Sequence, residues 1–224
     1  MNVGYLLFPN LTQLDFTGPL QILSRVPGAR SYIAARSLDP VPSDCGLGLM
    51  PTITLAECPP LEVLVVPGGL GVDDPMRDPA VLAFVRRQAE GARYVTSVCT
   101  GAFILGVAGL LRGRRATTHW AYHHLLVEVG AVPVHDRVVK DGKVVTGGGV
   151  TAGIDFGLAL AAEMSDAETA RCIQLAVEYD PAPPFGEGSP ARASLANVER
   201  LRELYRPRLE TFAEALRMAM ASPA

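Results

Sequence analysis

Residues 94–105, Tyr-Val-Thr-Ser-Val-Cys-Thr-Gly-Ala-Phe-Ile-Leu, begin as an apolar, β-branched segment that ends at Cys99 and continues directly into an apolar helical segment. This pattern predicts a buried strand, a sharp turn and a helix. The small residues Ser97 and Gly101 lie two positions before and after the cysteine, and we expect the turn to bring these positions together. The arrangement is the cysteine counterpart of the G-x-S-x-G nucleophile elbow.

A nucleophile elbow would raise the Cys99 side chain above the carboxyl end of the sheet. The free N–H groups and the dipole of the following helix then favour the thiolate, so we expect a lowered pKa and a nucleophilic sulfur. The alternative, from the local pattern alone, is a buried cysteine that serves as a small hydrophobic side chain.

Composition and length bound the class of protein. The 224 residues, 49% hydrophobic and 19% charged, predict one globular α/β domain over residues 1–224, in which about 186–224 form a C-terminal helical extension. A net charge of −3 argues against nucleic acid or an anionic membrane as the main partner. The four cysteines show no C-x-x-C spacing, so neither a zinc site nor a disulfide framework is indicated. The sequence begins with an apolar strand rather than a signal sequence and has no membrane-span-length segment, so we expect a cytoplasmic protein.

Two loops that follow predicted strands contain candidate functional groups. Asp15 lies between Leu14 and Phe16 in a strand-to-helix loop, where its carboxylate would face an apolar pocket; the alternative is a capping or loop-bracing aspartate. The strand at residues 61–66 runs into Pro-Gly-Gly-Leu-Gly at 67–71, whose backbone amides could approach a ligand or an oxyanion; the alternative is a tight turn that needs glycine.

The second half of the chain supplies further elements. Thr118 is the expected N-cap of a helix that begins with His119 and Trp120, which could reach an active site or could simply pack. Two strands meet at Asp-Gly, 141–142, the sequence of a type I′ hairpin turn. The proline-rich segment 179–190 is expected to form a rigid wall, and a last helix over 195–220 is expected to break near Pro207.

Several segments together are similar to the DJ-1/PfpI superfamily. They are the strand followed by Pro-Gly-Gly, the strand–Cys99–helix elbow, Thr-Thr-His-Trp at 117–120, and Thr-Gly-Gly-Gly-Val-Thr-Ala-Gly-Ile-Asp at 146–155. The resemblance covers nearly the whole chain. It implies a flavodoxin-like fold of the class I glutamine-amidotransferase type, with a mostly parallel central sheet.

Within the superfamily, Leu-Asp-Phe-Thr-Gly-Pro at 14–19, Val-Cys-Thr-Gly at 98–101 and the segment 179–190 most resemble the isonitrile hydratase family. That resemblance implies a homodimeric lyase that hydrates isonitriles to N-substituted formamides without metal or organic cofactor. It makes Cys99 the nucleophile that forms a thioimidate, Asp15 its acid/base partner and Thr100 a neighbouring hydrogen-bonding residue. Substrate contacts are then expected from the following residues: Gly69, Leu70, Phe16, His119, Trp120, Tyr179 and Phe185.

Two other functions stay open at this point. Relatives of AraC-type regulators share some of these segments, so the chain could be a stand-alone ligand-sensing domain. A DJ-1-like stress hydrolase or redox sensor would also use an elbow cysteine, through oxidation of the thiolate. Other branches of the superfamily have histidine directly after the cysteine and glutamate opposite it. This chain has Thr100 and Asp15 at those positions, which argues against protease-like, deglycase-like or glyoxalase-like activity.

Overall fold

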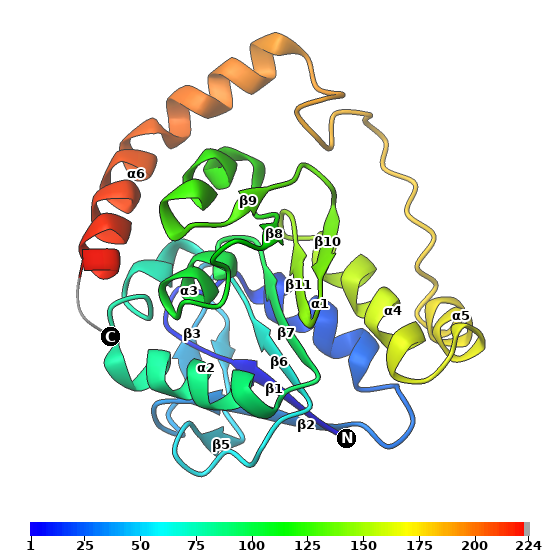
Figure 1. The fold of residues 1–224 in the computed structure, drawn as a ribbon. Coiled ribbons are helices and arrows are strands. Elements are labelled where there is room, and N and C mark those ends of the chain that lie inside the picture. Colours follow the sequence, from blue (N-terminus) through cyan, green and yellow to red (C-terminus); the bar gives the residue numbers. More distant parts are fainter. Residues whose placement is uncertain (222–224) are drawn as a thin grey trace.

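The computed structural model describes residues 1–221 and contains a central sheet of seven strands (Figure 1). The order across the sheet is β10-β11-β7-β6-β1-β2-β5, and every neighbouring pair is parallel except β10 with β11. The strands are β1 (Asn2–Leu6), β2 (Arg30–Ala35), β5 (Ile53–Thr54), β6 (Val63–Val66), β7 (Tyr94–Val98), β10 (Val138–Asp141) and β11 (Val144–Gly147). The predicted mostly parallel α/β sheet is therefore confirmed.

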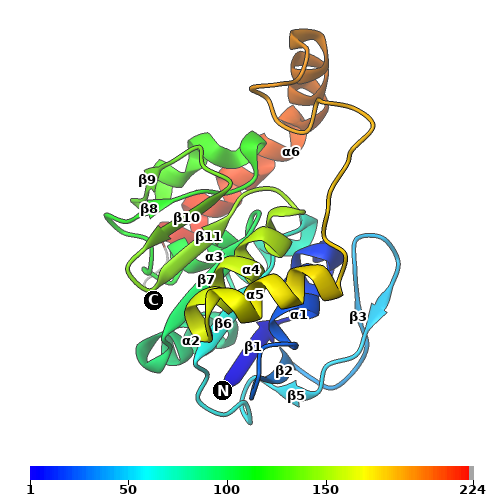
Figure 2. The same cartoon turned by 90° about the vertical axis from the view of Figure 1, so that its right-hand side faces the viewer.

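Helices cover both faces of this sheet, as Figures 1 and 2 show. On one face α1 (Gln13–Leu23) packs against α4 (Ala152–Met164), with α5 (Ala167–Ala176) outside α4. On the other face lie α2 (Pro79–Gly91), α3 (Gly101–Val107) and the 3₁₀ helix η2 (Trp120–Val129), with α6 (Leu195–Ala221) packed against η2 and α3. The remaining elements are β3 (Val41–Pro42), β4 (Gly48–Leu49), η1 (Leu70–Asp73), β8 (Arg115–Ala116) and β9 (Val132–Pro133).

The central strands are apolar because both of their faces are covered. Every residue of β6 and of β7 is buried, as expected for parallel strands between two helical layers. Parallel strands end at the same edge, so the loops after β1, β6, β7 and β11 meet there, which is where open α/β sheets bind their ligands.

The turn of the β10–β11 hairpin differs from the sequence prediction. Asp141 pairs with Val144, so the two loop residues are Gly142 and Lys143 rather than Asp141 and Gly142. Gly142 has φ of 60°, whereas Lys143 is not among the residues with positive φ. A type I′ turn needs positive φ at both loop residues, and a positive φ at the first alone is the pattern of type II′. The predicted hairpin is confirmed, and the predicted type I′ turn is wrong.

The last helix is continuous through Pro207, so the predicted break is wrong. A proline inside a helix removes one backbone hydrogen bond and usually kinks or ends it. Here the turns after Pro207 are held by packing, because Phe212 and Leu216 are fully buried against the body. Tertiary burial therefore outweighs the local preference of the proline.

The connector between α5 and α6 runs over the outside of the molecule, away from the sheet (Figures 1 and 2). Residues 180–188 are all exposed, and those at 184–188 line open hollows beside the first turns of α6. Among residues 1–221, no helix combines the length and the apolar character that crossing a membrane requires.

Candidate active site

Cys99 lies between β7 and α3 with φ of 55°, in the left-handed region. A side chain other than glycine adopts this conformation at a cost in free energy, so the surroundings must hold it. The Cys99 N–H donates to the carbonyl oxygens of Gly147 (3.1 Å) and Gly148 (2.8 Å), in the segment that ends β11. The Thr118 hydroxyl donates to the Cys99 carbonyl over 2.7 Å. Hydrogen bonds from two neighbouring loops therefore fix the predicted elbow.

The glycine after the elbow is required by the neighbouring strand. A Cβ on Gly101 would clash with the backbone carbonyls of Val66 and Pro67, which are nearer to it than Ser97 is. Position 101 therefore needs a small residue mainly because the backbone at the end of β6 lies so close. Ser97 is fully buried in β7, and its hydroxyl has no hydrogen-bond partner among the described residues.

Asp15 lies in the first turn of α1 and is fully buried. It does not cap the helix, since Thr12 occupies the N-cap position. Its Oδ2 accepts a hydrogen bond from the Gly68 N–H over 2.9 Å, and its Oδ1 has no partner of normal geometry in the described part of the chain. Burial raises the pKa of Asp15 to about 8 and the charge of Asp44 adds to this, while Gly68 and the Cys99 side chain oppose it. Asp15 therefore holds a proton at neutral pH.

The Cys99 side chain is next to Asp15 and is itself buried, with 6% of the residue exposed. Burial raises the pKa of the thiol, and the negative charge of Asp15 raises it further; the Thr100 backbone N–H and hydroxyl act in the opposite direction. The expected lowering of the pKa is therefore wrong for this chain, because desolvation outweighs the donors at the start of the short helix α3. Two adjacent buried groups that both become negative repel, so the pair retains a proton and titrates as a unit.

Thr100 and the glycine loop after β6 hold each other in place. The Gly69 N–H donates to Thr100 Oγ1 over 2.9 Å, and that hydroxyl lies 3.3 Å from the Gly69 carbonyl oxygen. A Cβ on Gly68 would lie 2.5 Å from the Thr100 nitrogen, and Gly69 has φ of 135°. The amides of Gly68 and Gly69 are bonded to Asp15 and Thr100, so neither is free to meet a ligand.

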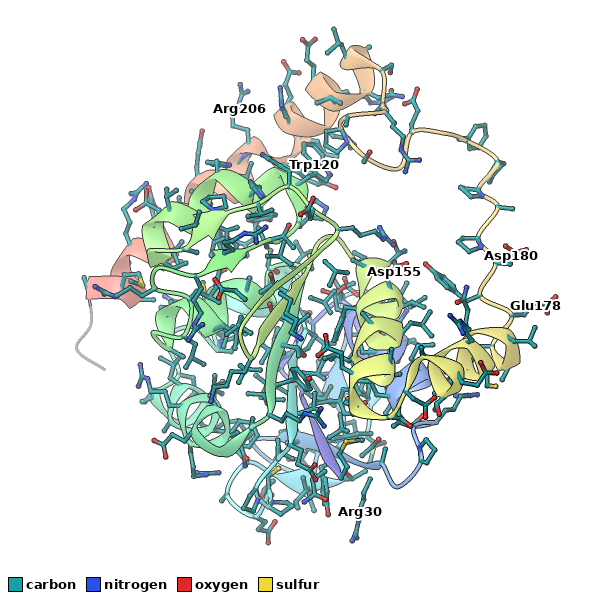
Figure 3. All side chains as sticks on the ribbon, turned by 45° about the vertical axis from the view of Figure 1, so that its right-hand side comes forward. Arg30, Trp120, Asp155, Glu178, Asp180 and Arg206 are labelled. Carbon is teal, nitrogen blue, oxygen red and sulfur yellow. The ribbon has the colours of Figure 1, made fainter. Side chains whose placement is uncertain are left out.

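His119 is brought to the elbow, although not in the way predicted. It is the N-cap of η2, with Nδ1 accepting from the Ala121 N–H over 3.3 Å, while Thr118 bonds to Cys99 instead of capping. The His119 ring packs on Gly149 in the loop after β11, and burial lowers its pKa. Trp120 is partly buried beneath α6 (Figure 3), where its ring and that of His119 each lie 6.1 Å from the ring of Tyr205.

Three of the predicted pocket residues lie elsewhere. Phe16 belongs to the core, where its ring meets the ring of Tyr5 edge to face at 5.6 Å. The Tyr179 hydroxyl donates to Asp155 in the first turn of α4 over 3.1 Å. Phe185 is 79% exposed because the connector does not fold back onto the body. Sequence reasoning placed these aromatic side chains by type alone, and the packing assigns them other positions.

The sequence did not single out the contribution of α6. Arg208 forms an ion pair with Asp73 of η1, and Phe212 packs edge to face on Tyr122 at 5.0 Å. Tyr122 is near the elbow, because the charges of Arg208 and Cys99 both act on its phenol. The sequence predicted the last helix but not which loop it meets. No group of three or more possible metal ligands occurs among residues 1–221.

A buried thiol lies at a strand-to-helix elbow, beside a protonated carboxyl from the first turn of α1. This arrangement defines a class of protein: an α/β protein of the nucleophile-elbow type. Residues 1–163 match the DJ-1/PfpI family, and the chain belongs to that family.

Isonitrile hydratase of Pseudomonas putida is 52% identical over 221 residues, 99% of this chain and 97% of its own. The crystal structure of a ThiJ/PfpI family protein from Pseudomonas syringae superposes with a TM-score of 0.93 at 42% identity, over 99% of this chain and 90% of that one. The HTH-type transcriptional regulator GbdR of Pseudomonas aeruginosa is 30% identical over 125 residues, which are 53% of this chain and 34% of the regulator.

Proposed function

We propose that the protein is an isonitrile hydratase, which adds water to R–N≡C to give an N-substituted formamide. The observation that carries this conclusion is the 52% identity to the Pseudomonas putida isonitrile hydratase along nearly the full length of both chains. A regulator or sensor is supported less, because the alignment to GbdR spans only about half of this chain.

The first step of the proposed mechanism joins sulfur to carbon. Cys99 Sγ attacks the terminal carbon of the isonitrile and its S–H bond breaks. Asp15, which holds a proton at neutral pH, gives that proton to the same carbon and takes up the proton of the thiol. The product is a thioimidate, R–N=CH–S–Cys99, and Asp15 is protonated again.

The second step hydrates this intermediate. Water adds to the thioimidate carbon, and Asp15 accepts a proton from the water while it donates its own to the nitrogen. The C–S bond of the tetrahedral adduct then breaks, the hydroxyl proton returns to sulfur through Asp15, and R–NH–CHO leaves. A neutral, protonated Asp15 suits both steps, because each needs a group that donates one proton and accepts another.

The other residues of the site have supporting roles in this proposal. The Thr100 hydroxyl orients the loop around Gly69, and the Leu70 amide stabilises the oxygen of the tetrahedral adduct. His119, kept neutral by burial, and Trp120 line the approach from η2. The chemistry calls on no metal or organic cofactor.

The remaining features of the proposal concern assembly and location. We propose a cytoplasmic homodimer in which residues 1–224 act as one unit and the segment after about residue 186 is an extension. The exposed leucines on the first turns of α6, Leu195 at 79% and Leu204 at 69%, are consistent with a partner surface in that region.

The test is an assay of the purified protein with an alkyl isonitrile, in which formamide is followed by chromatography and the Cys99 mass by mass spectrometry. We expect turnover in the presence of chelator and a transient adduct on Cys99. Cys99→Ala should be inactive, whereas the matched control Cys45→Ala, at an exposed cysteine, should keep full activity. Stoichiometric binding without formamide would identify a sensor instead.

A further inference from the structure

The C-terminal helix lies outside the residues that match the family, yet it bonds to a loop of the active site. The Arg208 guanidinium holds the Asp73 carboxylate in a two-pronged ion pair, with Nη1–Oδ2 at 2.9 Å and Nη2–Oδ1 at 2.7 Å. Nη2 also donates to the Leu70 carbonyl over 2.9 Å. The two charged side chains are only 23% and 24% exposed, so this ion pair is shielded more than a surface pair.

Leu70 is the last residue of the loop at 68–70, whose backbone groups form hydrogen bonds to side chains of the site. The Gly68 N–H bonds to Asp15, the Gly69 N–H bonds to Thr100, and the Leu70 carbonyl accepts from Arg208. Glycine backbone has many accessible conformations, and Gly69 at φ of 135° occupies one that few other residues adopt. The loop therefore depends on hydrogen bonds to stay in register, and Arg208 supplies one of them from outside the sheet.

The same arginine is also connected to the elbow through an aromatic contact. Its guanidinium lies 5.4 Å from the ring centre of Phe212, which packs on Tyr122. The Arg208 guanidinium is therefore held by contacts to α6 as well as to η1. These contacts fix its orientation without a bound ligand.

We propose that Arg208 is a positioning residue of the active site: it anchors the loop at residues 68–70, through Leu70 and Asp73, in the arrangement that aims Asp15 at Cys99. The inference rests on the proposed hydratase activity for its kinetic readout. It makes α6 a functional part of the site rather than an appendage of the family domain.

The test compares Arg208→Gln and Arg208→Lys with Arg206→Gln. Arg206 lies two residues away on the exposed side of the helix (Figure 3). Its side chain makes no hydrogen bond or ion pair among the described residues, so it is the matched control. We expect kcat to fall about 10- to 100-fold in Arg208→Gln with a smaller change in KM, because misplaced reacting groups slow the chemical step. Arg208→Lys should recover part of the loss, and Arg206→Gln should match the parent.

A second readout separates positioning from mere stability. The rate at which iodoacetamide alkylates Cys99, measured against pH with Cys45 and Cys172 replaced, reports the coupled titration of Cys99 and Asp15. We expect its midpoint to shift in Arg208→Gln and in Asp73→Asn, both measured well below their melting temperatures. Asp73→Asn also provides the answer if Arg208→Gln does not fold.

The outcomes are distinct. Parent-like kcat and an unshifted alkylation profile in the folded variants overturn the inference, as does a loss of activity that follows only the loss of folded protein. If the parent itself makes no formamide, the proposed function fails, and the alkylation profiles alone then decide whether Arg208 positions the loop.

Discussion

The Gly68 N–H lies 2.9 Å from Oδ2 of Asp15, and this one hydrogen bond joins the loop after β6 to the carboxyl that faces Cys99. It favours the ionised carboxylate, yet burial dominates and the carboxyl stays protonated at neutral pH. The site therefore combines two opposing effects: desolvation holds the proton, and the Gly68 donor keeps the group oriented for giving it up.

Replacement of Asp15 by asparagine preserves the shape of the side chain and removes its ability to transfer a proton. We expect turnover of an alkyl isonitrile to fall by roughly 10²-fold or more, the scale of losing a general acid/base. Asp39→Asn, in an exposed loop, is the matched control and should be fully active. Parent-like turnover of the folded Asp15→Asn variant would rule out the assigned role.

The pH dependence of stability follows from the same carboxyl. Because the pKa of Asp15 is raised from 3.8 to about 8, the folded state binds a proton that the unfolded state has released, and stability falls as pH rises between those values. The slope from one such group is at most about 1.4 kcal/mol per pH unit. Melting curves across this range should show the decline for the parent and a flatter profile for Asp15→Asn.

The pH dependence of activity should have the same origin. We expect kcat/KM to decline as pH rises above about 8, the value to which burial raises the pKa of Asp15, since the proton donor is then lost. The measured value belongs to the Asp15–Cys99 pair rather than to either residue. An alkaline limb that persists unchanged in residual Asp15→Asn activity would assign it to another group.

A methyl group at position 68 tests the close approach of the glycine loop to the elbow. In Gly68→Ala the new carbon would lie 2.5 Å from the Thr100 nitrogen and 2.6 Å from its hydroxyl, so the loop must move. Overpacking of this kind costs about 1–3 kcal/mol of stability, and the displaced reacting groups should lower kcat by up to roughly 10²-fold. Gly91→Ala, in a helix and with no atom near its Cβ position, should leave kcat unchanged and raise stability by no more than about 1 kcal/mol.

The attachment of α6 depends on Phe212, which is fully buried between Phe103 and Tyr122. Phe212→Ala should lower the free energy of unfolding by roughly 3–5 kcal/mol, since it leaves a cavity in the packed layer. Glu214→Ala, at an exposed position of the same helix, should change it by no more than about 0.5 kcal/mol. Denaturant melts of the two variants give the comparison, and equal effects would contradict the described packing.

Local sequence pattern predicted the elements that depend on neighbours along the chain. The strand before Cys99, the strand before the Pro-Gly-Gly loop and the β10–β11 hairpin all occur where the pattern placed them. The DJ-1/PfpI family membership is confirmed as well. Local periodicity and turn residues carry this information directly.

The features that escaped prediction depend on contacts between distant segments. Arg208 reaches Asp73 across 135 positions, and no local pattern marks that pair. The thiol pKa rose because burial of Cys99 beside Asp15 is a property of the assembled core. Thr118 looked like a helix cap, but the elbow offered its hydroxyl the Cys99 carbonyl instead. In each case tertiary packing outweighed a reasonable local preference.

The exposed connector between α5 and α6 has a consequence for proteases. An extended, exposed segment such as residues 180–188 is a preferred place for limited digestion. The helix beyond it is tied to the body by Phe212, Leu216 and the Arg208 ion pair, so cleavage there should leave the two fragments associated. The protein could then be prepared as a split enzyme, with the C-terminal peptide supplied as a separate, exchangeable piece.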